Sequence, residues 1–441
     1  MEAIMETTMK MIELENPQNL FKNRNFMLLF IGKLVSQLGD AIYTLAITWF
    51  ILNLTGTGVL MSLYLAIGMV TLIIMGPIGG VLADRWDRRR VIYGMDLIRG
   101  IAVAIAGVFF YLQVATTILL VALFSVTIII NVCSALFNPA SMAVTPLIVR
   151  EEQLTKANSL NSIVNSGANF VGLILGGILY AVIGVEGIFI LKAASYILSG
   201  VSEMFITLPQ GDKIKTDTEA NENNQTKGWT ELIEQMKEGY LYIKKERWIY
   251  VLIWAGFFIN VALAPMLTIF VPYIFNQIIK TEPIQLSYVQ SALGVGMILG
   301  AIFIGALPQR EKVGKFLKVV VTLVLIPLIG LAILFHLTQS AYYTNQVLIN
   351  GFIIGFLIIG VLMAMINIPI NVLFQRKVPN ELMGRVDAVL GTLMMAGMPI
   401  GMVVGGLLAD FISMQALLIG TAGIFMMITV GILLNEDTEL I

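Results

Sequence analysis

Several residue types are scarce in this chain of 441 residues, and each shortage excludes a kind of site. Only one cysteine is present, Cys133, so the chain has no disulfide framework and no cluster of thiolate metal ligands. A single histidine, His336, argues against a metal centre built on imidazoles. We therefore expect no resident metal ion and no cofactor.

Charge is scarce as well. Asp, Glu, Lys and Arg make up 12% of the residues, hydrophobic residues make up 58%, and the mean hydropathy is +0.88. Such a composition is typical of a chain that lies in lipid. The net charge of -1 gives no indication of nucleic-acid binding. The length leaves room for about a dozen membrane-crossing helices of roughly 20 apolar residues each.

Apolar runs separated by charged residues, glycine or proline predict twelve such helices. If the first helix runs outward, 23 of the 27 Lys and Arg residues lie on the cytoplasmic side, which predicts that both termini are cytoplasmic. The first 25 residues lack the pattern of a signal peptide, so we expect the N-terminus to be retained. We predict an all-α, multi-pass protein of the bacterial cytoplasmic (inner) membrane. The predicted spans are 26–52, 58–82, 91–112, 116–138, 157–181, 187–208, 249–276, 285–308, 316–337, 345–372, 384–410 and 413–434.

The longest gap between predicted spans, residues 209–248, divides six helices from six. Its first part is too polar to build a core and is predicted to be a linker. Its second part, from Trp229 to Trp248, has an apolar face opposite a charged face, which predicts an interfacial helix. An ordinary solvated connector helix is the alternative. We predict an N-terminal bundle over 1–208, a cytoplasmic linker over 209–248 and a C-terminal bundle over 249–441.

A glycine pattern recurs in the two halves. The sequence G-x-x-x-G-G-x-L begins at Gly172 in the fifth predicted span and again at Gly401 in the eleventh, an offset of 229 residues. Small residues at this spacing allow helices to pack closely in a membrane. The recurrence predicts a parallel repeat of two six-helix bundles, related by an axis along the membrane normal.

The loop between the second and third spans, residues 80–90, reads GVLADRWDRRR. A glycine, then Asp-Arg, then further basic residues in the first cytoplasmic loop resembles the signature loop of the major facilitator superfamily. The resemblance implies twelve helices in two six-helix bundles, and it implies that the loop is a gate that stabilises the outward-facing state. We group Asp96 and Arg99, at the start of the third span, with this gate. The gate residues are thus Gly80, Asp84, Arg85, Arg88, Arg89, Asp96 and Arg99.

Shorter pieces, such as Leu38-Gly39-Asp40 and ELMGRV at 381–386, resemble the drug:proton antiporter and macrolide-efflux branch of that superfamily. The second-half loop, residues 305–312, keeps the glycine and the basic charge but has Gln309 in place of the aspartate. The resemblance implies a transporter, not an enzyme, that exports small amphipathic molecules in exchange for protons by alternating access. A lipid or lysophospholipid flippase, or a siderophore exporter, of the same fold is the alternative. We expect a monomer in contact with membrane lipids, and no nucleic-acid partner.

Polar residues recur at helical spacing inside the first and fourth predicted spans. Lys33, Gln37, Asp40 and Thr44 are separated by 4, 3 and 4 residues and share one helix face. Both spans line the central cavity in the superfamily, so the resemblance implies a hydrated half-site there. Hydrogen bonding between helices inside the bundle is the alternative. The fourth span repeats the spacing with Thr127, Asn131, Ser134 and Asn138.

Charged side chains inside a membrane span need partners. Counted at 1.5 Å per residue, Asp40 and Lys192 lie at similar heights, and so do Lys33 and Glu203. We predict two ion pairs between the first and sixth spans, Asp40 with Lys192 and Lys33 with Glu203. If the first pair forms in only one conformation, Asp40 and Lys192 would couple a proton to transport, whereas a permanent pair would be structural.

The cavity-facing spans of the second half contain no charge. Aromatic, methionine and asparagine side chains there would form an uncharged wall, which suits an amphipathic ligand of variable shape. The alternative is that such residues are common in any membrane helix. The predicted wall consists of Trp254, Phe257, Phe258, Asn260, Met266, Met363, Met365, Asn367 and Asn371.

Overall fold

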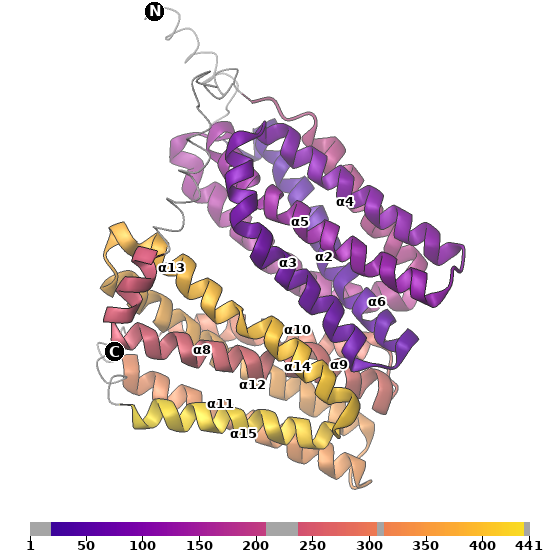
Figure 1. The fold of residues 1–441 in the computed structure, drawn as a ribbon, viewed down its shortest axis with the longest axis vertical. Helices are drawn as coiled ribbons and strands as arrows, with labels where there is room; N and C mark the ends of the chain where they lie inside the picture. Colours follow the sequence, from indigo (N-terminus) through magenta and orange to yellow (C-terminus); the bar gives the residue numbers. More distant parts are fainter. Residues whose placement is uncertain (1–18, 209–236, 307–312, 436–441) are drawn as a thin grey trace, which may run out of the picture. The chain divides into compact units, whose positions relative to one another are not determined.

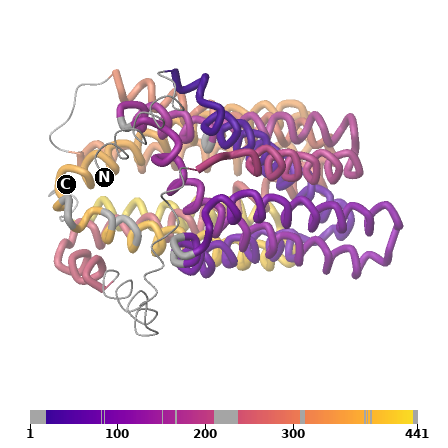
Figure 2. The backbone as a smooth tube through the Cα atoms, turned by 90° about the horizontal axis from the view of Figure 1, so that it is seen from above, coloured from indigo at the N-terminus to yellow at the C-terminus, as the bar shows by residue number. Residues whose placement is uncertain are grey.

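The computed structural model describes residues 19–208, 237–306 and 313–435, and these ranges contain helices and no β-strand. The chain divides into two compact units. The first comprises residues 1–47 and 67–224, and the second comprises residues 48–66 and 225–441. Within each unit the helices run nearly parallel to one another as a bundle (Figures 1 and 2). The predicted linker up to residue 236, and residues 307–312 of the second-half loop, lie outside the described residues.

Eleven helices in the described part of the chain are long and apolar enough to cross a membrane. One of them, α6 (Leu154–Glu203), has 50 residues. At 1.5 Å per residue it would be about 75 Å long, more than twice the thickness of a bilayer core. The helix breaks at Gly184, whose φ of 64° and ψ of -172° suit only glycine. Its two arms correspond to the fifth and sixth predicted spans, so the twelve-helix fold is confirmed.

The first unit is built from long helices held together by small residues. A Cβ atom on Gly100 of α4 would come against Ile197 of α6, and one on Gly200 of α6 would come against Leu97 of α4. These glycines therefore bring α4 and α6 close together. The elements are η1 (Leu20–Lys22), α2 (Arg24–Thr55), α3 (Gly58–Arg85), α4 (Arg88–Tyr111), α5 (Thr116–Ile148), η2 (Glu151–Gln153) and α6.

The second unit begins, in its described part, with a short helix over residues 237–245. Ile243 is buried, Tyr240 is half exposed, and Glu238 forms an ion pair with Arg385 of α13. This helix therefore packs against α13. The remaining elements are α8 (Arg247–Pro265), η4 (Met266–Phe270), α9 (Val271–Tyr273), η5 (Ile274–Ile278), α10 (Pro283–Ala306), α11 (Val313–Gln339), α12 (Asn345–Lys377), α13 (Asn380–Met395), α14 (Gly397–Phe411) and α15 (Met414–Leu434).

The seventh membrane span is not a regular α-helix. It runs from α8 through η5, and both η4 and η5 are π-helical turns of five residues. Pro265 ends α8 and Pro272 lies in α9. Because proline has no N–H group to donate to the preceding turn, it disturbs the regular ladder of helix hydrogen bonds at both places.

Hydrogen bonds explain why residues 48–66 belong to the second unit. The Asp410 carboxylate, at the end of α14, accepts bonds from the backbone N–H groups of Gly58 at 2.7 Å and Val59 at 3.3 Å. A carboxylate is stabilising at a helix N-terminus, and these are the first two residues of α3. Gln277 also donates to the Leu52 carbonyl at 3.0 Å. The connection between α2 and α3 is thereby fixed to this unit.

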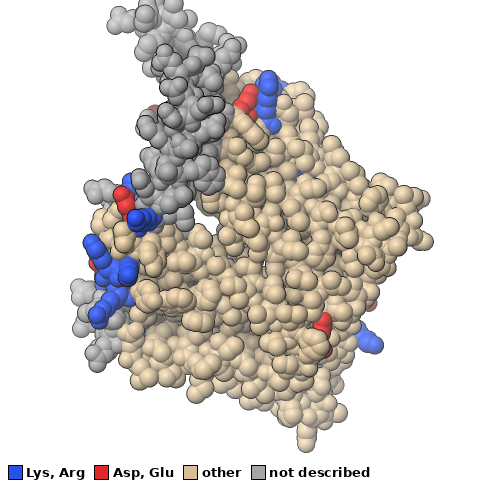
Figure 3. All heavy atoms as spheres, in the orientation of Figure 1, with Lys and Arg blue, Asp and Glu red and all other residues tan. Residues whose placement is uncertain are grey.

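The exposed side chains agree with a lipid surround. Figure 3 shows one face of the molecule, on which Lys, Arg, Asp and Glu gather near helix ends and the surface between them is uncharged. Ile101 and Ile105 of α4, and Ile298 and Ile302 of α10, are each more than half exposed. Apolar side chains in mid-helix are stable in contact with lipid tails.

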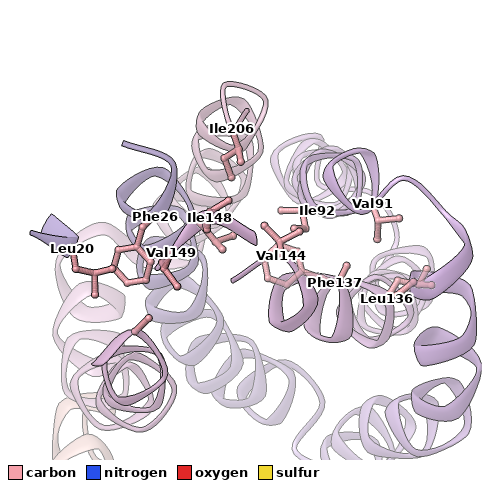
Figure 4. Packing of buried hydrophobic residues seen from close by; sticks show 14 residues of the cluster. Leu20, Phe26, Val91, Ile92, Leu136, Phe137, Val144, Ile148, Val149 and Ile206 are labelled. Atoms are coloured by element: carbon pink, nitrogen blue, oxygen red, sulfur yellow. The ribbon is translucent and has the colours of Figure 1, made fainter. Parts of the chain in front are cut away.

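An apolar cluster, here called the end cluster, closes the first unit at the end where α2 begins (Figure 4). It joins η1 and α2 to α4, α5 and the segment that follows α6. The polar Asn23, also buried there, donates to the Ile148 carbonyl at 2.6 Å. This end of the bundle is therefore tightly packed. The labelled members are Leu20, Phe26, Val91, Ile92, Leu136, Phe137, Val144, Ile148, Val149 and Ile206.

Exchange of Gly360 for alanine is expected to destabilise the second unit. Helix α10 crosses α12 so closely that a Cβ on Gly360 would collide with the Leu293 carbonyl, and one on Gly296 with the Leu357 carbonyl. We expect a loss of about 1–3 kcal/mol, measured as a lower unfolding midpoint in detergent. Gly330→Ala is the matched control, because nothing lies within 4 Å of its Cβ position. Equal midpoints for the two variants would contradict this packing.

Candidate functional site

Charged side chains of three helices meet inside the first unit. We call this group the charge cluster. Glycines bring α2 close to α6 there: a Cβ on Gly32 would come against Ser199, and one on Gly39 against Ser195. Since these glycines are seven residues apart, they lie on one face of α2. The charge cluster consists of Asp40 on α2, Asp96 and Arg99 on α4, and Lys192, Tyr196 and Glu203 on α6.

The Asp40 carboxylate has two partners on α6. The Lys192 ammonium lies 2.8 Å from Asp40 Oδ1, and the Tyr196 hydroxyl donates to the same oxygen. Lys192 also donates to the Ser36 carbonyl at 3.1 Å, and its Nζ lies 3.4 Å from the centre of the Tyr196 ring. The ion pair predicted between Asp40 and Lys192 is thus present in the structure.

The two members of this pair differ in their accessibility. The Lys192 side chain is 0% exposed, whereas the Asp40 side chain is 38% exposed. A buried ammonium without a counter-charge is costly inside a membrane protein, so Lys192 depends on Asp40. Water, protons or a ligand can reach the pair only from the Asp40 side.

Asp96 and Arg99 form a second, more deeply buried ion pair. The Arg99 guanidinium lies 4.7 Å from the centre of the Tyr196 ring and 4.8 Å from that of Phe137, close enough for cation–π contact. Arg99 also donates to the Ser134 hydroxyl at 3.3 Å. The structure places the side chains of Asp96 and Arg99 in the charge cluster, and their grouping with the gate loop stays a prediction.

The predicted ion pair between Lys33 and Glu203 does not form. Glu203 Oε1 is bonded to the Ser199 hydroxyl at 3.3 Å, and Oε2 has no hydrogen-bond partner among the described residues. The residue of α2 that faces Glu203 is Gly32, the neighbour of Lys33. Glu203 is therefore buried, and no cation of the described residues forms an ion pair with it.

The gate loop is described in part. The side chains of Asp84 and Arg85 lie outside the described residues. Arg89 donates to the Met204 carbonyl just after α6, and Arg88 also has an interaction partner. The loop is thus bonded to the end of α6, and its role as a gate stays a prediction.

The two predicted polar stripes have different surroundings. On α2, Gln37 is half-buried and Thr44 is exposed, and their role in lining a cavity stays a prediction. On α5, Asn131 donates to a carbonyl of its own helix at 2.8 Å, and Ser134 is part of the Arg99 environment. Asn138 is exposed. The α5 stripe therefore combines packing with exposed positions.

A cavity of about 140 Å³ lies inside the second unit. Asn260 and Asn367 line it, together with apolar side chains of α8, α11, α12, α13 and α15. Trp254, Phe257 and Asn371 are not part of its lining, and Trp254 instead stacks on Phe258 with ring centres 5.9 Å apart. Of the residues predicted for the uncharged wall, Asn260, Met363 and Asn367 line this cavity. The wall as a substrate-binding surface stays a prediction.

Sequence reasoning missed Tyr196 and Ser199. Both follow Lys192 on α6, by four and seven residues, and so lie on the helix face that carries Lys192 and Glu203. This spacing from Lys192 is the sequence signal by which both residues could have been found. Hydroxyl groups on such a face complete the hydrogen bonds of buried carboxylates.

Twelve membrane-crossing helices, with a cluster of buried charges in one bundle, define a polytopic membrane transporter. The family model of the Major Facilitator Superfamily matches residues 29–399. The chain belongs to this family, whose members and the relatives found here are transporters and not enzymes.

Characterised relatives are similar over nearly the whole chain. Macrolide efflux protein A of Streptococcus pyogenes is 26% identical over 392 residues, which cover 88% of this chain and 90% of that protein. Multidrug efflux pump Tap of Mycolicibacterium fortuitum is 24% identical over 431 residues, 92% of this chain and 96% of that protein. A bacterial homologue of the iron transporter ferroportin, solved in its inward-facing state, shares the fold with a TM-score of 0.72 at 16% identity, over 94% of this chain and 99% of that chain.

Proposed function

We propose that this chain exports amphipathic small molecules of the macrolide or drug-like class in exchange for protons. The observation that carries this proposal is the ion pair of Asp40 with Lys192, in which only the carboxylate is accessible. The printed functions of the relatives, macrolide efflux and multidrug efflux, support the substrate class. Export of this kind would confer antibiotic resistance on the host.

Asp40 would act as the coupling carboxylate. While ionised, it is held by the Lys192 ammonium and the Tyr196 hydroxyl. A proton on Asp40 removes the charge that attracts Lys192, and separation of the pair in turn frees the carboxylate to take up a proton. Proton binding and the state of the pair are therefore linked, which an alternating-access antiporter requires.

The cavity of the second unit would contribute to substrate binding. Its volume of about 140 Å³ is below the roughly 300 Å³ at which sites for drug-sized ligands begin. It would therefore take one apolar group of a substrate, with the amides of Asn260 and Asn367 as hydrogen-bonding partners. The lining carries no charge, which suits the apolar part of an amphipathic molecule.

We also propose that the protein is a monomer of the bacterial cytoplasmic membrane, with both termini in the cytoplasm and lipids around both bundles. The described residues contain no group of three or more His, Cys, Asp and Glu side chains placed to hold a metal ion. The likeness to the ferroportin homologue therefore supports the fold, and we do not extend it to a metal substrate.

Substrate-induced proton movement in proteoliposomes tests the proposal. The purified full chain is reconstituted with a pH-sensitive dye inside, and a panel of macrolides, other amphipathic drugs, lysophospholipids, siderophores and sugars is added. We expect proton movement with macrolides or other drugs, and uphill accumulation of the same compounds only when a proton gradient is imposed.

The alternatives give different results in the same panel. A response confined to lysophospholipids or to siderophores would replace the proposed substrate class by a flippase or a siderophore exporter. Uphill transport that ignores the proton gradient would contradict proton exchange. Greater drug resistance of an expressing strain is the expected result in cells.

A further inference from the structure

The face of α6 that carries Lys192 and Tyr196 continues through Ser199 to Glu203. The Glu203 side chain is 0% exposed, and its Oε2 has no hydrogen-bond partner among the described residues. Its Oε1 is 3.3 Å from the Ser199 hydroxyl. An ionised carboxylate in this position would be buried with a single weak partner, a costly arrangement within a membrane.

A second carboxylate with an unsatisfied oxygen lies next to it. Asp96 is also 0% exposed; its Oδ1 accepts from Arg99, and its Oδ2 has no partner in the described part of the chain. The Ser199 hydroxyl interacts with Asp96 as well as with Glu203, and the two carboxyl groups interact electrostatically. Two buried acids that interact in this way repel one another when both are ionised, and one proton shared between them removes the repulsion.

The balance of charges in the cluster also favours a proton on one of its carboxyl groups. It contains two cations, Lys192 and Arg99, and three carboxyl groups. The third carboxyl group can be neutralised by a proton, because within the described part of the chain Lys33, the buried cation of α2, forms no ion pair with it. Tyr196 of the cluster carries a hydroxyl group. Among the described residues, the other titratable groups next to the cluster are the buried thiol of Cys133 on α5 and the Arg89 guanidinium of α4, which donates to the carbonyl of Met204, the residue after Glu203.

We propose that Asp96, Ser199 and Glu203 form a second proton-binding site of this transporter, with Glu203 as the group that takes up and releases the proton. The site deepens the proposed proton exchange and rests on it for its role in transport. In the transfer between the two acids, the Glu203 O–H bond breaks as its proton bonds to Ser199 Oγ. The hydroxyl proton of Ser199 bonds to Asp96 in the same step, so one proton moves and Ser199 stays neutral.

The second site is separate from Asp40 but interacts with it. Lys192 and Glu203 are 11 residues apart on α6, about 16 Å along the helix. Asp96 interacts electrostatically with both Asp40 and Lys192, so a charge change at one site is felt at the other. Glu203 is 0% exposed and lies three residues before Ile206, a member of the end cluster (Figure 4). Exchange of its proton with bulk water therefore requires this end of the bundle to open.

Infrared difference spectroscopy of the full chain in lipid vesicles tests the site directly. A pH titration of the wild type should contain the carbonyl band of a protonated, buried carboxyl group. Glutamate labelled with ¹³C should shift this band, and Glu203→Gln should remove it, whereas Asp40→Asn should leave it in place. Ser199→Ala keeps both acids and should shift the band, because it removes the hydroxyl that bridges them.

Transport provides the second readout. Glu203→Gln should slow substrate-driven proton movement about tenfold or more, as loss of a proton relay does, with substrate binding unchanged. Glu186→Gln, at an exposed position of the same helix, is the matched control and should behave as the wild type.

The outcomes separate this proposal from the proposed function. No glutamate-dependent band in the labelled wild type, or a band that persists in Glu203→Gln, would overturn the second site. Because the labelling experiment needs no substitution, poor folding of Glu203→Gln would not affect it. A band that behaves as expected in a protein whose transport ignores protons would instead overturn proton exchange and the transport role of the site.

Discussion

Asp40→Asn is expected to abolish uphill, proton-driven export while downhill exchange of substrate continues. Asparagine keeps the size of the side chain and can still accept a bond from Tyr196, but it cannot carry a proton between the two sides of the membrane. The measurement is accumulation of the most active panel compound in proteoliposomes, with and without an imposed pH gradient. The wild type should accumulate the compound only with the gradient, and the variant under neither condition.

Two comparisons make this result specific. Glu282→Gln removes an exposed carboxylate of the second unit and should leave uphill transport intact. Binding of the same compound to the purified variant should be within a few-fold of wild type, which shows that the site is still folded. Undiminished uphill transport by Asp40→Asn would refute the coupling role and leave the ion pair as a structural feature.

Substitution of Asp40 should destabilise the protein more than substitution of Lys192. Asp40→Asn leaves the fully buried Lys192 ammonium without its counter-charge, which we expect to lower the free energy of unfolding by up to about 3 kcal/mol. Lys192→Met leaves a carboxylate that water can reach, and the expected loss is about 1 kcal/mol or less. Unfolding midpoints of the two variants in detergent measure the difference.

The double variant is the decisive comparison. Asp40→Asn with Lys192→Met has no charge at this position, so it should recover most of the stability that Asp40→Asn loses, yet it should not transport uphill. If both single variants lose the same stability, the unequal burial of the two side chains does not control the pair. Recovered transport in the double variant would show that this pair is not needed for coupling.

Hydropathy, the distribution of basic residues and the loop at 80–90 were enough to predict the fold, because lipid restricts a chain of this composition to membrane-crossing helices. Helix ends were less predictable. The fourth span was expected to end at Asn138, before Pro139, but α5 continues to Ile148 with Pro139 and Pro146 inside it. Proline is tolerated in a membrane helix when neighbouring groups satisfy the freed carbonyls, and no local sequence signal reports those neighbours.

The charge cluster could be predicted only in part, because height along a helix does not determine which face a residue occupies. Lys192 reaches Asp40 by passing along Gly39, and its Cδ lies 3.3 Å from the position of a Cβ there. Glu203 meets Gly32 in the same way, but its side chain is shorter and ends at Ser199. The packing of α2 on α6 therefore selects one of the two height-matched pairs.

The surroundings of Asp96 and Arg99 on α4 could not be predicted from their own helix. Their spacing of one helical turn was predicted only as part of the gate, and the ion pair between them is a finding of the structure. Their neighbours Tyr196 and Ser134 lie on α6 and α5, and only the packed bundle brings them together. In the second unit, Asn260 lines the cavity and Trp254 does not, because six residues separate them and they lie on different faces of α8.

The two π-helical turns give the seventh span unequal stiffness along its length. The 19 residues of α8 form a continuous hydrogen-bonded helix, whereas the segment after Pro265 contains the two π-helical turns η4 and η5 and one further proline, Pro272. A bend is easier in the second segment, because some of the hydrogen bonds that would resist it are already missing. The seventh span therefore consists of a rigid first part, α8, and a second part that bends more easily. A tilt of α8 relative to the end of the span would be taken up in residues 266–278.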